Sequence, residues 1–328
     1  MSIETSPAVP IGESQIREAV ERLAPWVHLT PVATSRTLDE RAGASVFLKC
    51  ENLQRVGAFK FRGAMNALLQ LDDASKAAGV VTHSSGNHAQ ALALAGKLLG
   101  VPVTVVMPDT APPIKQAATA GYGATIRLCE PTLAAREAAV ADEIARKGLT
   151  LVHPFNDWNV IAGQATAAWE LLDQVGPLDA VVVPVGGGGL LAGTALAVKA
   201  RSPETLVIGV EPERADDARR SLASGRIEPS GDPQTIADGL RTSLGERPFA
   251  VISRQVDRIE TASEAAIVDA LRFLWERLKL VVEPSSAVVV APLLERKLDL
   301  EGRRIGAVLS GGNVDLGPFF DALAARWL

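Results

Sequence analysis

Short runs of β-branched residues alternate along this chain with longer stretches rich in alanine and leucine. The short runs have the length and composition of buried strands, and the longer stretches are long enough for helices. This alternation predicts an α/β fold whose parallel strands are joined by right-handed crossovers. The expected strands are 45–49, 80–83, 103–107, 125–128, 180–183, 206–210 and 305–309. The expected helices include 14–23, 62–71, 88–99, 113–120, 133–147, 160–174, 190–200, 264–279 and 286–295.

Charge and length restrict the possible partners and locations. The 328 residues suffice for two domains or one large one, and they carry a formal net charge of −5 without a long Lys/Arg run. Nucleic acid is therefore not expected as a partner. The N-terminal residues have no basic segment before an apolar stretch, so a cytoplasmic protein without a signal peptide is expected. Cys50 and Cys129 lie in apolar, strand-like surroundings and are predicted to be buried free thiols.

A run of four glycines, Gly186 to Gly189, follows the strand expected at 180–183. The uncharged segment 180–198 is nearly long enough to span a bilayer, but Pro184 and the glycines favour a strand, a loop and a helix, so no membrane partner is expected. Glycines let backbone amides approach a phosphate, and the following helix adds its dipole. Gly187, Gly189 and Ala192 also satisfy the dinucleotide pattern G-x-G-x-x-A. A nicotinamide-dependent oxidoreductase is therefore an alternative from a different class.

Three further segments carry residues suited to chemistry. Lys60 lies between Phe59 and Phe61, and an apolar environment lowers the pKa of a lysine, although such a lysine is more often a surface charge. The segment 84–90 follows a strand and opens a helix, where backbone N–H groups favour a carboxylate, or where the serines simply cap the helix. Ser310 follows the last expected strand, and its hydroxyl is able to bond a ring nitrogen.

Together and in this order, the four motifs resemble those of the fold-type II pyridoxal-phosphate enzymes, the tryptophan synthase β family. The similarity is greatest to its branch of serine/threonine dehydratases, serine racemase and 3-hydroxyaspartate dehydratase, and it spans about 16–316. It implies two open, twisted, mostly parallel sheets flanked by helices, and a homodimer. It also implies a large cofactor-binding domain, 1–54 and 152–328, and a small mobile domain, 55–151, that closes on the substrate.

The resemblance implies pyridoxal 5′-phosphate as the cofactor. Lys60 then forms the Schiff base and takes the substrate's α-proton, and Ser310 faces the pyridine nitrogen. A serine does not keep that nitrogen protonated as a carboxylate would, so the ring is a weaker electron sink and prompt loss of a β-leaving group is favoured. The remaining cofactor contacts implied by the resemblance are Phe59, Asn87 at the phenolic oxygen, Gly186, Gly187, Gly188, Gly189 and Leu190 at the phosphate, and Gly239 against the ring.

The resemblance also implies roles toward the substrate. Ser84, Ser85, Asn87 and His88 form the loop that holds its carboxylate. Ser85 matches the acid/base of racemases on the second face, with a helix cap as its plain alternative. Arg136 is placed to meet a second carboxylate, or is a surface charge. Asn156 lies near the substrate in the family.

An acidic segment after the strand at 206–210 resembles the divalent-cation site of the same branch. Glu211, the carbonyl of Ala215 and Asp217 would bind Mg²⁺, or Mn²⁺ or Ca²⁺, with water completing the shell. The plain alternative is a solvated acidic loop.

The expected function is a pyridoxal-phosphate-dependent ammonia-lyase. It would convert a small β-hydroxy amino acid (L-serine, L-threonine or 3-hydroxyaspartate) to a 2-oxo acid and ammonia. The nearest alternative is an amino-acid racemase with dehydratase side activity. The nicotinamide oxidoreductase leaves the segments around Lys60, Asn87 and Ser310 unexplained. A non-catalytic amino-acid sensor on the same fold is a further alternative.

Overall fold

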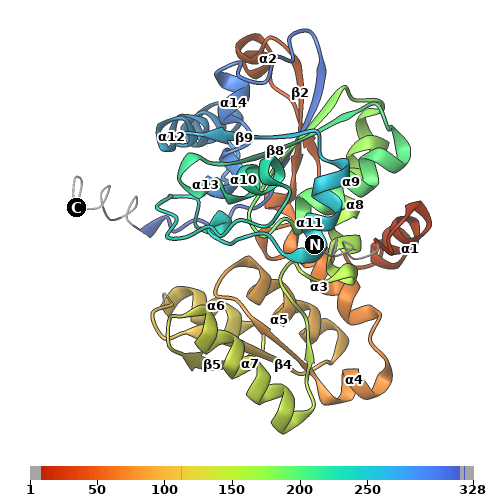
Figure 1. The fold of residues 1–328 in the computed structure, drawn as a ribbon, viewed down its shortest axis with the longest axis vertical. Helices are drawn as coiled ribbons and strands as arrows, with labels where there is room; N and C mark the ends of the chain where they lie inside the picture. Colours follow the sequence, from red (N-terminus) through yellow and green to blue (C-terminus); the bar gives the residue numbers. More distant parts are fainter. Residues whose placement is uncertain (1–8, 112, 318–320, 322–328) are drawn as a thin grey trace.

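The computed structural model describes residues 9–111, 113–317 and 321, which form two sheets in two lobes (Figure 1). The upper lobe holds a six-stranded sheet, in which only the β1–β2 pair is antiparallel. Its order is β1 (Val32–Ala33), β2 (Ser45–Cys50), β10 (Arg304–Leu309), β7 (Ala180–Pro184), β8 (Leu206–Pro212) and β9 (Arg258–Ala262). The lower lobe holds a parallel sheet with the order β5 (Thr125–Cys129), β4 (Val103–Pro108), β3 (Val80–His83) and β6 (Thr150–Leu151).

Helices cover these sheets, and α3 (Lys60–Leu69) lies between the lobes and packs on both α8 and α5 (Figure 1). The lower lobe has α4 (Asp73–Ala78), α5 (Asn87–Leu99), α6 (Pro113–Gly121) and α7 (Leu133–Lys147). The upper lobe has α1 (Glu13–Leu23), α2 (Arg36–Ala42), α8 (Trp158–Val175), α9 (Gly189–Arg201), α10 (Asp217–Ser224), α11 (Glu246–Gln255), α12 (Glu264–Phe273), α13 (Pro284–Ala287) and α14 (Ala291–Leu294). Short 3-10 turns lie at Glu51–Leu53, Arg55–Gly57, Glu213–Ala215 and Asp238–Leu240.

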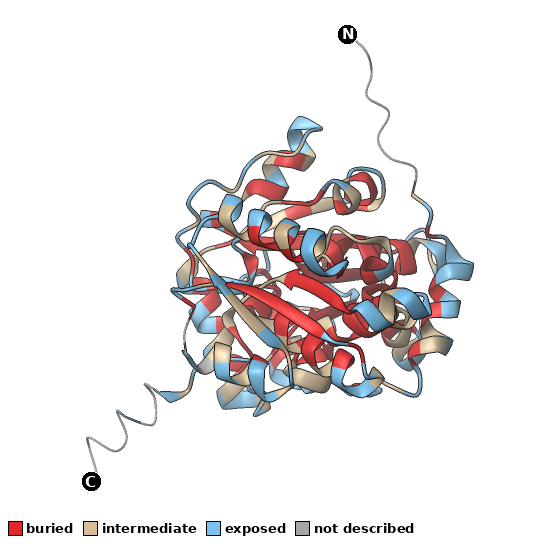
Figure 2. Ribbon diagram, turned by 90° about the horizontal axis from the view of Figure 1, so that it is seen from below, coloured by how far each residue is buried: buried red, intermediate tan, exposed pale blue. Residues whose placement is uncertain are grey.

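The central strands are buried on both faces because helices lie on each side of the sheets. Every residue of β7, with the sequence AVVVP, is buried, as expected for a parallel strand inside an α/β layer. Figure 2 shows the buried strands at the centre and the exposed residues on the outer sides of the helices. No helix in the described ranges is long and apolar enough to cross a membrane.

Two glycines let α3 approach α8 closely. A Cβ on Gly163 would lie 2.6 Å from the carbonyl oxygen of Arg62 and from the Cα of Gly63. A Cβ on Gly63 would lie 2.2 Å from the side-chain nitrogen of Gln164. Neither position has room for a larger residue. The close crossing of α3 and α8 therefore fixes the position of α3, and of Lys60 at its start, relative to the upper lobe.

An ion network, fully buried except at Glu170, holds the same end of α3. The guanidinium of Arg62 donates to both carboxylate oxygens of Glu51 at 2.8 Å and to both of Glu170 at 2.7 Å. Lys49 Nζ also donates to Glu170, at 2.9 Å. Burial alone would raise the pKa of Glu51, but the charge and hydrogen bonds of Arg62 lower it. Two cations and two anions therefore balance each other inside the protein and join β2, α3 and α8.

The strands expected from the sequence are all present, as β2, β3, β4, β5, β7, β8 and β10. The short strands β1 and β6 and the edge strand β9 were not expected. The helix expected over 286–295 is wrong: α13 and α14 are separated by a turn at residues 288–290. Three consecutive valines there and Pro292 just beyond both disfavour a continuous helix. The helix expected over 264–279 passes from α12 into a π-helical turn at Leu274–Leu278.

The two cysteines are free, and one expectation about them is corrected. Cys50 is buried as predicted, and burial raises the pKa of its thiol to about 11. Cys129 is only half-buried, because β5 is an edge strand whose outer side is not covered by a neighbouring strand. The domain boundaries inferred from the sequence stay a prediction.

Candidate active site

The segments around Lys60 and Ser310, far apart in the sequence, are bonded to each other. The backbone N–H of Phe59 donates to the Ser310 carbonyl at 3.0 Å, and that of Gly312 to the Gly57 carbonyl at 2.9 Å. Between these bonds, Ala58 and Gly311 form an isolated antiparallel bridge. The tertiary fold thus places the start of α3 beside the end of β10, where ligands of a parallel sheet bind.

Lys60 is half-buried, and its amine faces the interior. Its Nζ donates to the Pro154 carbonyl at 2.9 Å and lies 5.2 Å from the ring centroid of Phe59. Burial lowers the pKa of Lys60 to about 8, and the negative charge of Glu283 opposes that shift. At pH 7 about a tenth of the amine is then neutral, which is the nucleophilic and basic form, far more than for a lysine with its ordinary pKa.

The glycine loop between β7 and α9 has free donors. Among the described residues, the N–H groups of Gly186, Gly187 and Gly188 have no hydrogen-bond acceptor. A Cβ on Gly187 would lie 2.3 Å from the Phe155 ring, and Gly188 has a φ of 86°, which favours glycine. Free amides at the start of a helix form an anion site. Phe155 directly follows Pro154, whose carbonyl accepts the hydrogen bond of the Lys60 amine. The segment Pro154–Phe155 therefore contacts both the glycine loop and that amine.

Ser310 is buried at the end of β10, and its hydroxyl lies 3.0 Å from that of Ser286. The Ser286 hydroxyl donates to the Gly311 carbonyl at 2.7 Å and accepts from the Gly311 N–H at 2.6 Å. Since Ser286 uses its only proton on Gly311, the proton of Ser310 is free to point either to Ser286 or to a ring nitrogen beside it.

Glu283 is a site residue that the sequence reasoning missed. It is buried and accepts two hydrogen bonds from the Asn87 amide, at 3.0 and 3.1 Å. Asn313 donates to the Asn87 oxygen at 2.9 Å, so the amide of Asn87 is held from both sides. Burial raises the pKa of Glu283 to about 7, against the effect of the Asn87 hydrogen bond. The only sequence signal was a glutamate before a proline, which is too common to indicate a site.

The loop Ser84–His88 lies between β3 and α5. Ser84 Oγ accepts a bond from the Gly86 N–H at 3.3 Å, and Ser85 is half-buried. His88 Nε2 lies 3.3 Å from the Val152 carbonyl, which only accepts, so Nε2 carries the proton. Burial, and then the charge of Lys60, hold the pKa of His88 well below its usual value. The ring of His88 is therefore engaged with Val152, and only its backbone N–H is free for an anion.

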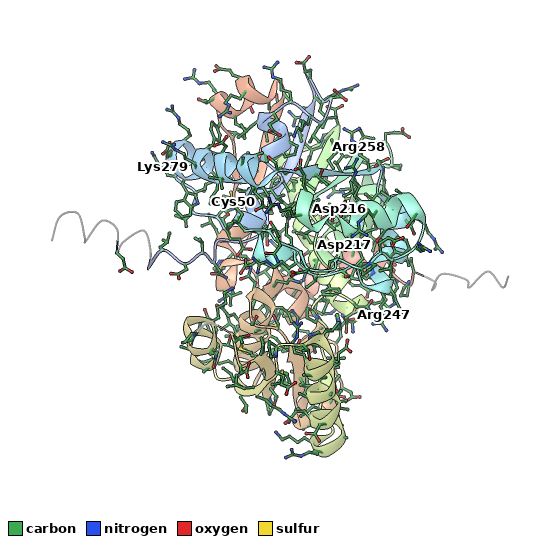
Figure 3. The ribbon with its side chains drawn as sticks, turned by 60° about the vertical axis from the view of Figure 1, so that its left-hand side comes forward. Cys50, Asp216, Asp217, Arg247, Arg258 and Lys279 are labelled. Carbon is green, nitrogen blue, oxygen red and sulfur yellow. The ribbon has the colours of Figure 1, made fainter. Side chains whose placement is uncertain are left out.

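Two expected substrate contacts are engaged in hydrogen bonds with the protein itself. Arg136, on α7, is half-buried, and its Nε donates to the Thr132 carbonyl of its own helix at 3.3 Å. Asn156 accepts from the Arg247 N–H through its side chain at 2.9 Å and from the Arg247 guanidinium through its carbonyl at 3.0 Å. Figure 3 shows Arg247 near the junction of the two lobes. Gly239 donates to Ser285 Oγ at 3.1 Å, on the side of the site occupied by Glu283.

Glu211 and Asp217 form a separate buried acidic pair in the upper lobe. Glu211 ends β8 and accepts from the N–H groups of Ala218 at 3.1 Å and Arg219 at 2.7 Å. One carboxylate oxygen of Asp217 is buried without a partner among the described residues. Burial raises the pKa of Glu211 to about 8 and that of Asp217 to about 6. Figure 3 shows Asp216 and Asp217 in the upper lobe, above Arg247.

A metal site made only of side chains is not found in the described ranges, where no three His, Cys, Asp or Glu gather. The orphaned Asp217 oxygen nevertheless fits a cation that takes a backbone carbonyl and water as its other ligands.

Comparisons with known proteins give a consistent result. Residues 23–311 match the family described as pyridoxal-phosphate dependent enzyme. The chain is 50% identical over 308 residues to a β-hydroxyaspartate dehydratase of Paracoccus denitrificans, covering 94% of this chain and 98% of that protein. It is also 50% identical to an L-threo-3-hydroxyaspartate ammonia-lyase of Saccharomyces cerevisiae, covering 95% and 96%. The solved structure of a serine racemase from Dictyostelium discoideum is similar with a TM-score of 0.90 and 46% identity, covering 93% and 99%.

Proposed function

Because this chain belongs to the pyridoxal-phosphate dependent enzymes, in the branch of hydroxyaspartate dehydratases and serine racemases, we propose that it is an ammonia-lyase acting on 3-hydroxyaspartate. The observation that carries this proposal is the position of Lys60. Its amine bonds Pro154, next to the Phe155 that covers Gly187 in the glycine loop, and the segment before it is hydrogen-bonded to Ser310. The nicotinamide alternative rested on the glycine run alone. It is dropped because the chain belongs to a family that uses pyridoxal phosphate instead.

The residues present fit pyridoxal 5′-phosphate. Three unpaired amides at a helix start suit its phosphate, and a Cβ at Gly187 would clash with Phe155. We assign Lys60 to the covalent attachment of the cofactor, Ser310 to its ring nitrogen, and the Asn87 amide to its phenolic oxygen. Phe59, Gly186 to Gly189, Leu190 and Gly239 complete the set. When bound, the cofactor supplies the electron sink that acidifies the substrate's α-carbon.

The chain's own residues then do three things. The N–H groups of the loop Ser84–His88 hold the substrate's α-carboxylate at the start of α5. Lys60, whose lowered pKa of about 8 makes the neutral amine accessible near neutral pH, takes the α-proton on one face. Loss of the β-hydroxyl follows, and hydrolysis of the product yields a 2-oxo acid and ammonia. Arg136 and Asn156 would contact the rest of the substrate.

This function is tested by measuring release of 2-oxo acid from the 3-hydroxyaspartate stereoisomers, L-serine and L-threonine with the same purified holoenzyme. We expect kcat/KM for one 3-hydroxyaspartate isomer to exceed that for L-serine and L-threonine by about tenfold or more. A preference for L-serine or L-threonine would overturn the assigned substrate, and absence of oxo acid from all of them would overturn the lyase assignment in favour of a sensor.

The racemase alternative is favoured by one observation at Ser85. Its hydroxyl is half-buried and has no hydrogen-bond partner within the described residues, so it is free to act as a second acid/base. The variant Ser85→Ala is expected to lose any inversion of L-serine, while α-proton loss to Lys60 continues and oxo acid is still released. Chiral chromatography of the amino acid, with the oxo acid assay in parallel, checks this. Equal inversion by wild type and variant would exclude Ser85 from that role.

We further propose that Glu211, Asp217 and the Ala215 carbonyl bind Mg²⁺, or Mn²⁺ or Ca²⁺. A ligand that binds only the folded state stabilises it by RT ln(1 + [L]/Kd), or about 2.7 kcal/mol at a hundredfold excess over Kd. Adding Mg²⁺ after chelation is therefore expected to raise the thermal midpoint of the wild type. Glu211→Gln should lose this rise, and the exposed neighbour Glu213→Gln should keep it. No rise in the wild type would exclude a working site.

The proposed assembly is a homodimer, as the resemblance implied, and the proposed location is the cytoplasm. Light scattering after gel filtration gives the mass that tests the dimer.

A further inference from the structure

We propose that His83 and His153 form a pair of donors for the second carboxylate of a dicarboxylic substrate. The inference rests on the proposed function and deepens it, because it names the side chains that would select 3-hydroxyaspartate over serine. Of the chain's four histidines, the sequence analysis assigned a role to His88 and none to His83 or His153.

The pair lies between the loop Ser84–His88 and the glycine loop. His83 ends β3 directly before Ser84, and its ring centroid lies 5.3 Å from that of His153 at an interplanar angle of 83°. The His153 ring lies 4.6 Å from that of Phe155, which covers Gly187. Lys60 bonds Pro154, the residue after His153. A small substrate with its α-carboxylate on Ser84–His88 and its α-carbon at Lys60 would therefore have its β-substituents close to this pair.

The hydrogen bonds of the two rings leave donors unused. His153 Nδ1 accepts from the N–H groups of Phe155 at 3.3 Å and Asn156 at 2.9 Å. The proton of neutral His153 is therefore on Nε2. In the described part of the chain, neither this Nε2 nor either ring nitrogen of His83 has a hydrogen-bond partner. These nitrogens are not among the fully buried atoms without a partner, so a ligand is able to reach them. His88 differs, since its donor is already taken by Val152.

The charges around the pair favour an anion. Arg136 and Glu137 act on His83, whereas Lys60 and Arg247 act on His153. With Lys60 given to the cofactor, two arginines, Arg136 and Arg247, face the two rings against one carboxylate, Glu137, in a chain whose formal net charge is −5. Burial, followed by His83 and Lys60, lowers the pKa of His153 to about 3, and burial, followed by Arg136, lowers that of His83. Both rings are therefore neutral donors at neutral pH, while Arg136 supplies the charge.

Two variants separate this role from a structural one. His153→Asn keeps an acceptor at the δ position for the Phe155 and Asn156 N–H groups and removes the Nε2 donor. His83→Phe keeps an aromatic ring for the edge-to-face contact and removes both nitrogens. His28→Phe is the matched control, because that side chain is exposed and outside the site.

The holoenzyme is assayed with 3-hydroxyaspartate and with L-serine. We expect each site variant to raise KM for 3-hydroxyaspartate by about tenfold or more, since a carboxylate loses a hydrogen bond, and to leave KM for L-serine within about twofold. An equal change with both substrates, or no change, would overturn the inference. The His28→Phe control should match the wild type with both.

A binding measurement decides the inference even without turnover. Calorimetric titration of wild-type holoenzyme is expected to give at least about tenfold tighter binding of malonate than of acetate, because malonate carries a second carboxylate. His153→Asn and His83→Phe should each lose most of that difference. If they keep it, the pair does not bind the second carboxylate. A wild type that releases no 2-oxo acid would instead overturn the proposed function, and the malonate titration would still test the histidines.

Discussion

Replacing Lys60 with alanine is expected to lower kcat/KM for 2-oxo acid release by about 10³-fold or more. General base catalysis alone contributes about 10²–10⁴-fold, and the alanine variant also loses the covalent attachment of the cofactor. The contacts of Lys60 support so large an effect, because its amine is aimed at the Pro154 carbonyl, in the segment that also contacts the glycine loop. A coupled oxo acid assay at saturating cofactor measures the change.

Absorbance gives an independent measure of the same variant. The wild type should be yellow and lose that colour on borohydride treatment. Lys60→Ala should instead release its cofactor on dialysis, because only non-covalent contacts with the cofactor remain. Lys97→Ala, on the exposed face of α5, is the control and should behave as the wild type. A colourless Lys60→Ala variant with full activity would rule out the proposed chemistry.

The variant Arg62→Met is expected to lower the free energy of unfolding by about 3–5 kcal/mol. Removing one partner of a buried ion pair leaves the other charge uncompensated. Here Glu51 would keep only the Thr30 hydroxyl, at 2.6 Å, within its fully buried pocket. Glu170 would still be bonded by Lys49. Urea denaturation of the holoenzyme measures the loss as a lower midpoint.

The double variant Arg62→Met/Glu51→Leu separates charge balance from simple loss of packing. It removes one cation, Arg62, and one anion, Glu51. The two charges that remain, Lys49 and Glu170, form an ion pair and cancel each other. Since buried ion pairs replaced by apolar side chains are often neutral for stability, most of the loss should be recovered. Arg17→Met, at an exposed position of α1, should change the midpoint little. A double variant no more stable than Arg62→Met would contradict this account of the network.

Features that depend only on neighbouring residues could be predicted from the sequence. Runs such as AVVV at 180–183 are apolar throughout because strands buried on both faces need no polar side, so the parallel sheets could be predicted. A run of four glycines has few purely structural uses, so an anion-binding loop is predicted there, and the N–H groups of Gly186 to Gly188 have no acceptor among the described residues. The order of the motifs then indicated the cofactor family, which the comparisons showed.

Only the tertiary structure decided which distant residues meet. Glu283 bonds Asn87, His153 packs against His83, and Lys60 bonds Pro154, and no local pattern marks these pairs. The valines at 288–290 form a turn that is buried in the upper lobe, so their apolar character predicts burial there but not the break between α13 and α14. Periodicity reports which face of an element is buried, whereas contacts across the sheets depend on how complete elements pack. The sequence therefore predicted the motifs of this site, and packing alone determined the groups that orient them.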